Sequence, residues 1–203
     1  MTELFLIRHG ETPWTRAKRY QGSTDIPLNA KGRHQARATA KRLLARHPDI
    51  LYTSTLKRSR ETGEIIAQAF RKRPCVDPRI NEIDFGSWEG KTAKELLRHR
   101  DRAFSHWVRG EWVTPTGGET KSAFRKRIAH FLRDVLKHHQ GKKIAVVSHG
   151  GPIKMIIFEL QKLSSLSLWA LRVDPCSFSV VDVFPDFSQL VTLNDTAHLE
   201  GLK

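Results

Sequence analysis

The chain has 203 residues, of which 39% are hydrophobic and 28% are charged. This length can bury a substantial hydrophobic core, and the composition excludes a disordered chain or one embedded in a membrane. Lys and Arg number 35 against 21 for Asp and Glu, a formal net charge of +14. Most of these basic residues are typical of a solvated surface, and attraction of anionic ligands is the sharper interpretation. The basic residues are scattered and are not interleaved with exposed aromatic residues, so the pattern does not favour a nucleic-acid partner.

The N-terminus and the cysteines bear on where the protein resides. The first residues have no basic start and only a short apolar run over residues 4–7, unlike a secretory signal. No later segment approaches the length of a transmembrane helix. We therefore expect a cytoplasmic protein without membrane attachment, in which Cys75 and Cys176 are reduced thiols.

The first half of the chain predicts two strands and two helices in alternation. Residues 4–7 are typical of a buried strand and lead into a polar loop over residues 10–28. Asn29 is suited to cap a helix, which ends at His47 because a residue before proline avoids helical angles. A second strand over residues 50–54 and a second helix over residues 56–70 follow. The expected inward-facing residues of these helices are Ala36, Ala40, Leu43, Leu44, His47, Ile65, Ile66 and Ala69.

The second half of the chain is richer in helices. Residues 75–76 predict a short third strand, and residues 92–109 predict a helix. Apolar residues from Phe124 to Leu136 recur at helical spacing. Residues 144–147 form a continuous apolar run of the kind found inside a parallel sheet, and a helix follows from Pro152. The last predicted elements are a closing pair of strands over residues 178–184 and 190–193.

This alternation predicts an α/β fold with a mainly parallel central sheet flanked by helices on both faces. We expect a single domain over residues 1–203. The segment from about residue 91 to residue 140 contains no predicted strand, so we expect it to form a small helical cap over one end of the sheet.

Charged residues gather where three of the predicted strands end. Arg8 and His9 follow the first strand, His149 follows residues 144–147, and Arg58 lies shortly after the second strand. Ligands of open α/β sheets bind beyond the carboxyl ends of the strands, so these side chains converge if the strands are neighbours. Arginine forks suit the oxygens of a phosphate monoester, and a histidine between them can act as the nucleophile.

Transfer of a phosphoryl group also requires a proton for the leaving oxygen. Glu82 and Asp84 lie in the loop after the third strand, and both are candidates for the general acid. The helix that begins near Pro152 adds backbone N–H groups and the positive end of a dipole. Each of these residues taken alone is equally typical of an ordinary loop or helix surface, and only the joint pattern favours phosphoryl transfer.

Several motifs, in their family order, resemble those of the histidine phosphatase superfamily, the phosphoglycerate-mutase-like proteins. The resemblance covers essentially the whole chain. The motifs are LIRHGET at residues 6–12, YQG at 20–22 with DIPL at 25–28, YTSTLKR at 52–58, Glu82 with FGSWEG at 85–90, GGET at 117–120 and VSHGG at 147–151.

The resemblance implies catalytic roles for five residues. His9 resembles the nucleophile that becomes phosphorylated. Arg8, Arg58 and His149 resemble the charged pocket around the phosphoryl group. Glu82 resembles the general acid and base, which favours it over the second carboxylate of its loop.

Further phosphate contacts are implied for Gln21, Gly22 and the backbone of Gly150. Thr15 stands where many family members have asparagine. A threonine hydroxyl can still donate to phosphate, but its reach is shorter, so a substrate contact of Thr15 is left open.

The resemblance also bears on cofactors and partners. The family uses no metal, and the sequence contains neither an HExxH motif nor a run of carboxylate ligands. We therefore expect no cofactor and a small phosphorylated substrate. A homodimer is consistent with the family.

Alternatives remain within and beyond the phosphatases. The resemblance implies that mutases of the family are longer chains, with extra residues after the loop that carries Glu82. A phosphoglycerate mutase is therefore the less favoured enzyme. The short chain resembles α-ribazole phosphatases, with phosphoserine, sugar-phosphate and broad-specificity phosphatases as alternatives. A non-catalytic relative that binds anions or nucleic acid is disfavoured by the intact site residues. The candidates for substrate specificity, or for core packing, are His106, Trp107, Arg109 and Trp112.

Overall fold

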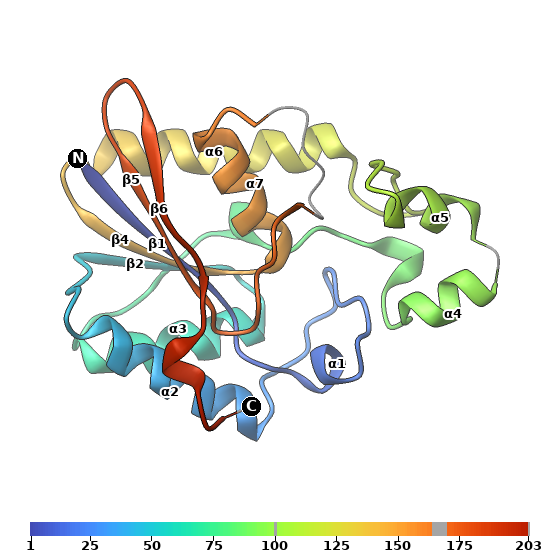
Figure 1. Ribbon diagram of the computed structural model, residues 1–203, viewed down its shortest axis with the longest axis horizontal. Coiled ribbons are helices and arrows are strands. Elements are labelled where there is room, and N and C mark those ends of the chain that lie inside the picture. Colours follow the sequence, from blue (N-terminus) through green and yellow to red (C-terminus); the bar gives the residue numbers. More distant parts are fainter. Residues whose placement is uncertain (100, 164–169, 203) are drawn as a thin grey trace.

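In the computed structural model, residues 1–99, 101–163 and 170–202 are described. Within them a six-stranded sheet crosses the centre of the molecule in the order β3-β2-β4-β1-β5-β6 (Figure 1). The strands are β1 (Thr2–Arg8), β2 (Ile50–Thr53), β3 (Cys75–Val76), β4 (Lys143–Ser148), β5 (Phe178–Val183) and β6 (Ser188–Asp195).

The sheet is parallel in its first four strands and antiparallel at one edge. β1 pairs with β4, β4 with β2, and β2 with β3, all in parallel. β5 runs antiparallel to β1, and β6 runs antiparallel to β5. The expected mainly parallel α/β fold is therefore confirmed.

Helices cover both faces of the sheet (Figure 1). α2 and α3 contact each other on one face, and α6 and α7 do so on the other. The helices are α1 (Pro13–Arg16), α2 (Ala30–Leu43), α3 (Lys57–Ala69), α4 (Ala93–Arg98), α5 (Arg102–Val108), α6 (Lys121–His138) and α7 (Gly150–Leu160). Short 3-10 helices are η1 (Pro78–Ile80), η2 (Gly86–Trp88) and η4 (Ala197–Leu199).

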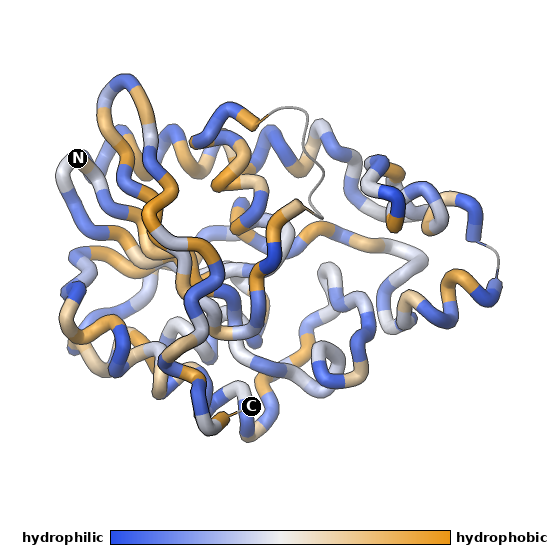
Figure 2. The backbone as a smooth tube through the Cα atoms, viewed as in Figure 1, coloured by the Kyte–Doolittle hydropathy of each residue, from blue (hydrophilic) through white to orange (hydrophobic). Residues whose placement is uncertain are grey.

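Alternate residues of the strands pack into two hydrophobic cores, one on each face of the sheet, because successive side chains of a strand point to opposite faces. In β1, Leu4 and Leu6 join the cluster that contains the apolar faces of α6 and α7. Phe5 and Ile7 join the cluster under α2 and α3. Figure 2 shows the complementary pattern along α6, whose tube alternates between hydrophobic and hydrophilic residues as expected for a helix with one buried face.

Local signals placed most elements but not every helix end. Asn29 caps α2 through a hydrogen bond from the Gly32 N–H to its side chain. α2 ends at Leu43, four residues before the expected end, so Leu44 and His47 are exposed. Ala69, expected in the core, is also exposed and is the last residue of α3.

The segment expected as a helical cap divides into two kinds of structure. Residues 92–109, expected as one helix, form α4 and α5, with Asp101 capping α5 through the Phe104 N–H. These two helices extend away from the sheet (Figure 1). α6 instead packs along the sheet beside α7 and buries Phe131 and Val135 in the core.

Candidate active site

The ends of β1, β4 and β2 bring the predicted histidines and arginines together. Arg8 pairs in register with Ser148, so the residues that follow, His9 and His149, leave neighbouring strands at the same edge. Their ring centroids lie 5.0 Å apart. β2 is the other neighbour of β4, and the chain after it carries Arg58 to the same place on the second residue of α3.

His9 is held as a neutral ring with one defined tautomer. Its Nδ1 atom lies 2.8 Å from the carbonyl oxygen of Gly10, so Nδ1 carries the proton and Nε2 keeps its lone pair. Only 1% of the residue is exposed. Burial, followed by the positive charges of Arg58 and Arg8, lowers the pKa of His9 well below 6.5.

His149 is also neutral, and both of its nitrogens are engaged. Arg58 Nε donates to His149 Nδ1 at 3.2 Å, which leaves the ring proton on Nε2, 2.7 Å from Ser54 Oγ. Burial lowers the pKa of His149 well below 6.5, and the charge of Arg58 lowers it further. Ser54 was not among the residues predicted for the site, since nothing local marks a serine at a strand end.

The Arg58 guanidinium is fixed by backbone carbonyls from the polar loop after β1. Its Nη1 and Nη2 atoms donate to the carbonyl oxygens of Thr24 at 2.8 Å and Gly22 at 2.7 Å. Burial lowers the pKa of Arg58 to about 10, so the group is still cationic at neutral pH. Gly22 was predicted as a phosphate contact, and the structure places its carbonyl on Arg58.

Within the described part of the chain, Arg8 has both a paired and an unpaired hydrogen-bond donor. Its Nη1 atom donates to the carbonyl oxygen of Val173 at 2.7 Å. Its Nε atom is buried and has no hydrogen-bond partner among the described residues. An unsatisfied buried donor is costly, so this atom is suited to an oxygen of a bound anion.

Glu82 reaches the first turn of α7. Its Oε1 atom accepts hydrogen bonds from the N–H groups of Ile83 at 3.0 Å and Gly151 at 3.1 Å. A Cβ atom built on Gly150 would lie 3.9 Å from Glu82 Oε2 and 4.0 Å from the Cζ atom of Arg8. The carboxylate and the guanidinium therefore flank the N-terminus of this helix.

A cavity of about 360 Å³ opens beside these groups. Glu82 is among its lining residues, whereas Asp84 lies outside it and accepts a hydrogen bond from the Gly86 N–H. Tyr20, Phe85 and Trp107 provide an aromatic wall, with the Tyr20 and Phe85 rings 5.1 Å apart. The other lining residues include Gly150 and the polar residues Arg8, Thr15, Lys18, Arg19, Gln21 and Lys154.

Gln21 and Thr15, the predicted contacts from the loop after β1, differ in whether a hydrogen-bond donor is available for a ligand. Gln21 lines the cavity, and its Oε1 atom accepts a hydrogen bond from the Thr12 hydroxyl at 2.8 Å, so its amide NH2 group can face a ligand. The Thr15 hydroxyl donates to the Thr12 carbonyl at 3.0 Å and accepts from the Thr12 N–H at 2.7 Å. The hydroxyl proton of Thr15 is therefore used in a hydrogen bond within the first turn of α1.

The proposed specificity residues are also separated. Trp107 lines the cavity. Trp112 packs against Trp107, with ring centroids 5.4 Å apart, and His106 pairs with Glu111 on an exposed surface. Lys154, one turn into α7, lines the cavity but was not predicted, because a lysine within an apolar helix gives no local sign of a site.

The geometry agrees with a comparison to known families. A model of the histidine phosphatase superfamily (branch 1) matches residues 4–196. The chain belongs to the histidine phosphatase superfamily. This histidine phosphatase shares 34% identity over 200 residues with phosphoserine phosphatase 1 of Hydrogenobacter thermophilus, covering 98% of this chain and 95% of the relative.

Two further relatives have the same general activity. This histidine phosphatase is 32% identical to the adenosylcobalamin/alpha-ribazole phosphatase of Salmonella typhimurium, with 96% of both chains covered. A phosphoserine phosphatase mutant from Entamoeba histolytica, solved in complex with phosphoserine, has a TM-score of 0.87 and 32% identity, covering 98% of this chain and 100% of that chain. The expected enzyme class, a phosphatase, is thereby confirmed.

The described residues of this histidine phosphatase offer neither a metal site nor a membrane span. They contain no group of three His, Cys, Asp or Glu side chains that could hold a metal ion. None of the helices in the described ranges combines the length and hydropathy needed to cross a lipid bilayer.

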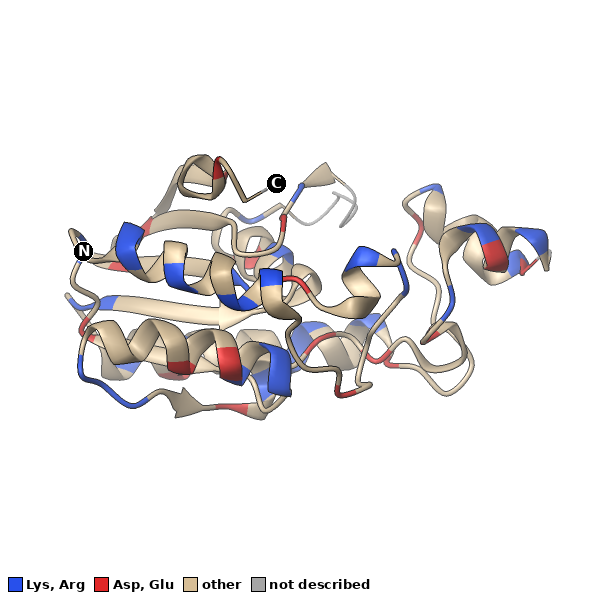
Figure 3. Ribbon diagram, turned by 90° about the horizontal axis from the view of Figure 1, so that it is seen from below, with Lys and Arg blue, Asp and Glu red and all other residues tan. Residues whose placement is uncertain are grey.

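Figure 3 shows basic residues on many elements. Among the charged residues, α2 carries only basic ones, whereas α3 carries both basic and acidic ones.

Proposed function

We propose that this histidine phosphatase hydrolyses a small phosphate monoester without a metal ion, through a phosphohistidine on His9. The observation that carries the proposal is the hydrogen bond between His9 Nδ1 and the Gly10 carbonyl. It leaves Nε2 of a neutral ring unprotonated within the electrostatic influence of Arg58 and Arg8, and a lone pair is what a nucleophile requires.

In the first step, His9 Nε2 forms a bond to phosphorus while the bond from phosphorus to the ester oxygen breaks. Glu82 gives its proton to the leaving oxygen, which departs as an alcohol. Arg8 and Arg58 bear positive charge beside the phosphoryl oxygens as charge shifts during transfer. Gln21 and the N-terminus of α7 at Gly150 supply further donors to the same oxygens.

In the second step, water replaces the alcohol. The Glu82 carboxylate takes a proton from this water, the water oxygen bonds to phosphorus, and the bond from phosphorus to His9 breaks. Inorganic phosphate leaves, and His9 returns to its neutral form. Burial beside two arginines favours that form, because the same environment lowers the pKa of the ring.

His149 contributes in a different way. Its ring is fixed between Arg58 and Ser54, so we assign it to holding the Arg58 guanidinium in place and to lining the phosphoryl site. Thr15 closes α1 through Thr12, and a direct contact with phosphate would require that bond to rearrange.

Two substrate classes are supported by different parts of the cavity. The aromatic wall formed by Tyr20, Phe85 and Trp107 suits the ring of a nucleoside-like ester such as α-ribazole 5'-phosphate. Lys154 suits the carboxylate of an acidic ester such as phosphoserine. Relatives named for each activity are similar to this chain to nearly the same degree.

The test is a phosphatase screen in EDTA with α-ribazole 5'-phosphate, phosphoserine, 3-phosphoglycerate and several sugar phosphates. His9→Ala is the key variant, and His34→Ala, which changes an exposed histidine of α2, is its control. We expect a turnover that survives EDTA and the His34 change but is lost in His9→Ala. Quenching with radiolabelled substrate should trap an acid-labile label on the wild-type protein only.

The outcomes separate the remaining alternatives. Equal turnover by the His9→Ala variant would exclude the phosphohistidine mechanism. Phosphoglycerate interconversion that depends on a bisphosphate would favour the mutase alternative, and absence of any turnover would favour the anion-binding relative. The homodimer and the cytoplasmic location stay predictions, which size-exclusion chromatography and fractionation would test.

A further inference from the structure

Arg127 of α6 holds the backbone of the loop that carries Glu82. Its Nη1 atom donates to the carbonyl oxygens of Arg79 and Asn81, both at 2.7 Å. Its Nη2 atom donates to the carbonyl oxygen of Glu82 at 3.0 Å. One guanidinium therefore ties together three residues that lead directly to the carboxylate.

A carboxylate fixes the guanidinium in turn. Glu119 accepts from Arg127 Nε at 2.7 Å and from Nη2 at 2.8 Å, a bidentate pair of two largely buried side chains. The guanidinium carbon also lies 4.8 Å from the centre of the Phe124 ring. The fork geometry that satisfies all of these partners at once is a property of arginine that lysine lacks.

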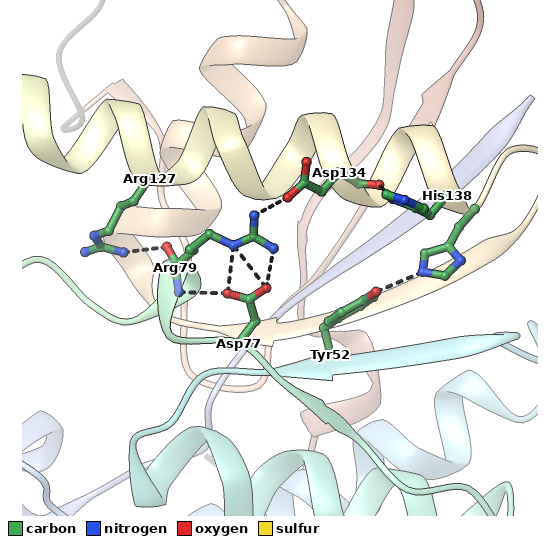
Figure 4. A network of polar contacts seen from close by, with 7 residues as sticks. Tyr52, Asp77, Arg79, Arg127, Asp134 and His138 are labelled. Atoms are coloured by element: carbon green, nitrogen blue, oxygen red, sulfur yellow. Dashed lines mark hydrogen bonds and ion pairs between the residues drawn. The ribbon is translucent and has the colours of Figure 1, made fainter.

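The same loop is tied to α6 at a second point. Figure 4 shows Arg127 reaching the Arg79 carbonyl while the Arg79 side chain meets Asp77 and Asp134. Arg79 Nη2 lies 2.7 Å from an Asp77 oxygen, and its Nη1 atom donates to Asp134 of α6. The backbone from Asp77 to Glu82 is therefore held against α6 at both ends.

We propose that Arg127, fixed by Glu119, is a positioning residue for Glu82. The inference rests on the proposed function, in which Glu82 is the general acid and base. Arg127 holds the Glu82 main chain, while Ile83 and Gly151 hold its carboxylate. Since misplacement of a reacting group by about 1 Å can cost on the order of 100-fold in rate, loss of this support impairs proton transfer before it impairs folding.

The variants are Arg127→Met and Arg127→Lys, and the matched control is Arg125→Met. Arg125 lies on the same helix, is exposed, and pairs with Glu159 of α7. The Arg127 side chain is 20% exposed and borders a hollow of about 350 Å³ with Asn81, Glu82 and Glu119. Water can reach the carbonyls from this hollow, so we expect both variants to fold.

The readout is kcat/KM for p-nitrophenyl phosphate and for phenyl phosphate. This ratio reports the steps up to phosphoryl transfer to the enzyme. The p-nitrophenolate ion leaves without a proton, whereas phenolate needs the general acid. We expect Arg127→Met to lose on the order of tenfold or more on phenyl phosphate, a fraction of the 10²–10⁴-fold that acid catalysis contributes, and far less on the nitrophenyl ester.

Arg127→Lys separates position from charge. It keeps the positive charge but cannot reach three carbonyls and a carboxylate together, so we expect the same selective loss on phenyl phosphate. Full activity in this variant, or an equal loss on both esters, would overturn the proposal. Arg125→Met should match the wild type on both esters.

Glu82→Gln distinguishes failure of this inference from failure of the proposed function. If Arg127 acts through Glu82, adding Arg127→Met to Glu82→Gln should cost little more than Glu82→Gln alone. Additive losses would overturn the positioning role while leaving Glu82 as the acid. If Glu82→Gln by itself shows no loss on phenyl phosphate, the assigned acid is wrong and the positioning role falls with it.

Discussion

The Nε atom of Arg58 lies 3.2 Å from the Nδ1 atom of His149, so a permanent cation donates directly to an imidazole nitrogen. This contact is compatible only with a neutral ring, because a protonated Nδ1 would have no lone pair to accept the bond. The same arginine lowers the pKa of His9. Both histidines of the site are consequently neutral in the folded protein, and their neutrality should make the stability of the protein depend on pH.

Stability should fall as the pH falls below about 6.5. The pKa values of His9 and His149 lie well below 6.5 in the folded protein, chiefly because of burial. Below that pH the unfolded chain therefore binds protons that the native protein does not, and the free energy of unfolding decreases. Each histidine contributes up to about 1.4 kcal/mol per pH unit.

Urea titrations between pH 8 and pH 5 would measure this dependence. The double variant His9→Gln, His149→Gln should show a shallower slope over the same range, whatever its absolute stability. An unchanged slope would mean that other groups, such as His198, whose pKa is also lowered by burial, account for the dependence.

Replacement of Arg58 by lysine should damage both stability and activity. Arg58 donates to His149 and to the carbonyls of Gly22 and Thr24, and a single ammonium cannot serve all three. Each buried acceptor left without a donor costs about 1–3 kcal/mol. We expect an unfolding free energy lower by at least that amount, measured by chemical denaturation. Arg60→Lys, at an exposed site paired with Glu64, should change stability by less than about 0.5 kcal/mol.

Alanine should have opposite effects at the two glycines that begin α7. At Gly151 a Cβ atom would lie 2.5 Å from Glu82 Oε1 and 2.7 Å from Ile83 Cδ1, so it would displace the carboxylate. At Gly150 the nearest atoms are 3.9 Å away, and alanine favours a helix over glycine by up to about 1 kcal/mol.

We therefore expect Gly151→Ala to lower the melting temperature and to reduce kcat/KM on phenyl phosphate. Gly150→Ala should have a melting temperature equal to or above that of the wild type. A lower melting temperature for Gly150→Ala than for Gly151→Ala would contradict the placement of the Glu82 carboxylate.

The two thiols should differ sharply in reactivity. Cys75 is exposed on β3, whereas Cys176 is fully buried, and burial raises the pKa of its thiol to about 12. Since the thiolate is the reactive species, an aromatic disulfide reagent should label one thiol per native chain and the second only in denaturant. Cys75→Ser should abolish the native labelling, and labelling that persists would indicate that Cys176 is accessible.

Much of the fold follows from patterns that are local in the chain. The alternation of Leu4, Phe5, Leu6 and Ile7 between two cores is the direct result of the two-residue period of a strand. Asn29 marked the start of α2 because a cap is made by residues three positions apart. Helix ends were less determinate, as Leu44, His47 and Ala69 show, because burial at an end depends on which element lies opposite.

The family resemblance gave the expected roles of His9, Arg8, Arg58, Glu82 and His149, and its motifs are visible in the sequence. The residues that support them were not visible. These supporting contacts join distant parts of the chain. Ser54 contacts His149, the carbonyls of Gly22 and Thr24 accept from Arg58, and Arg127 binds the Glu82 loop. Neither periodicity nor spacing indicates such partners.

The sequence by itself therefore determined most of the strand and helix pattern and the fold class, and its motifs named the side chains that we propose for catalysis. Only the tertiary structure decided that both histidines are neutral, which nitrogen of His9 keeps its lone pair, and that Glu82 rather than Asp84 borders the cavity. The physical reason is that tautomers, pKa values and side-chain positions depend on burial and on partners brought together by the fold, whereas secondary structure depends largely on neighbours in the chain.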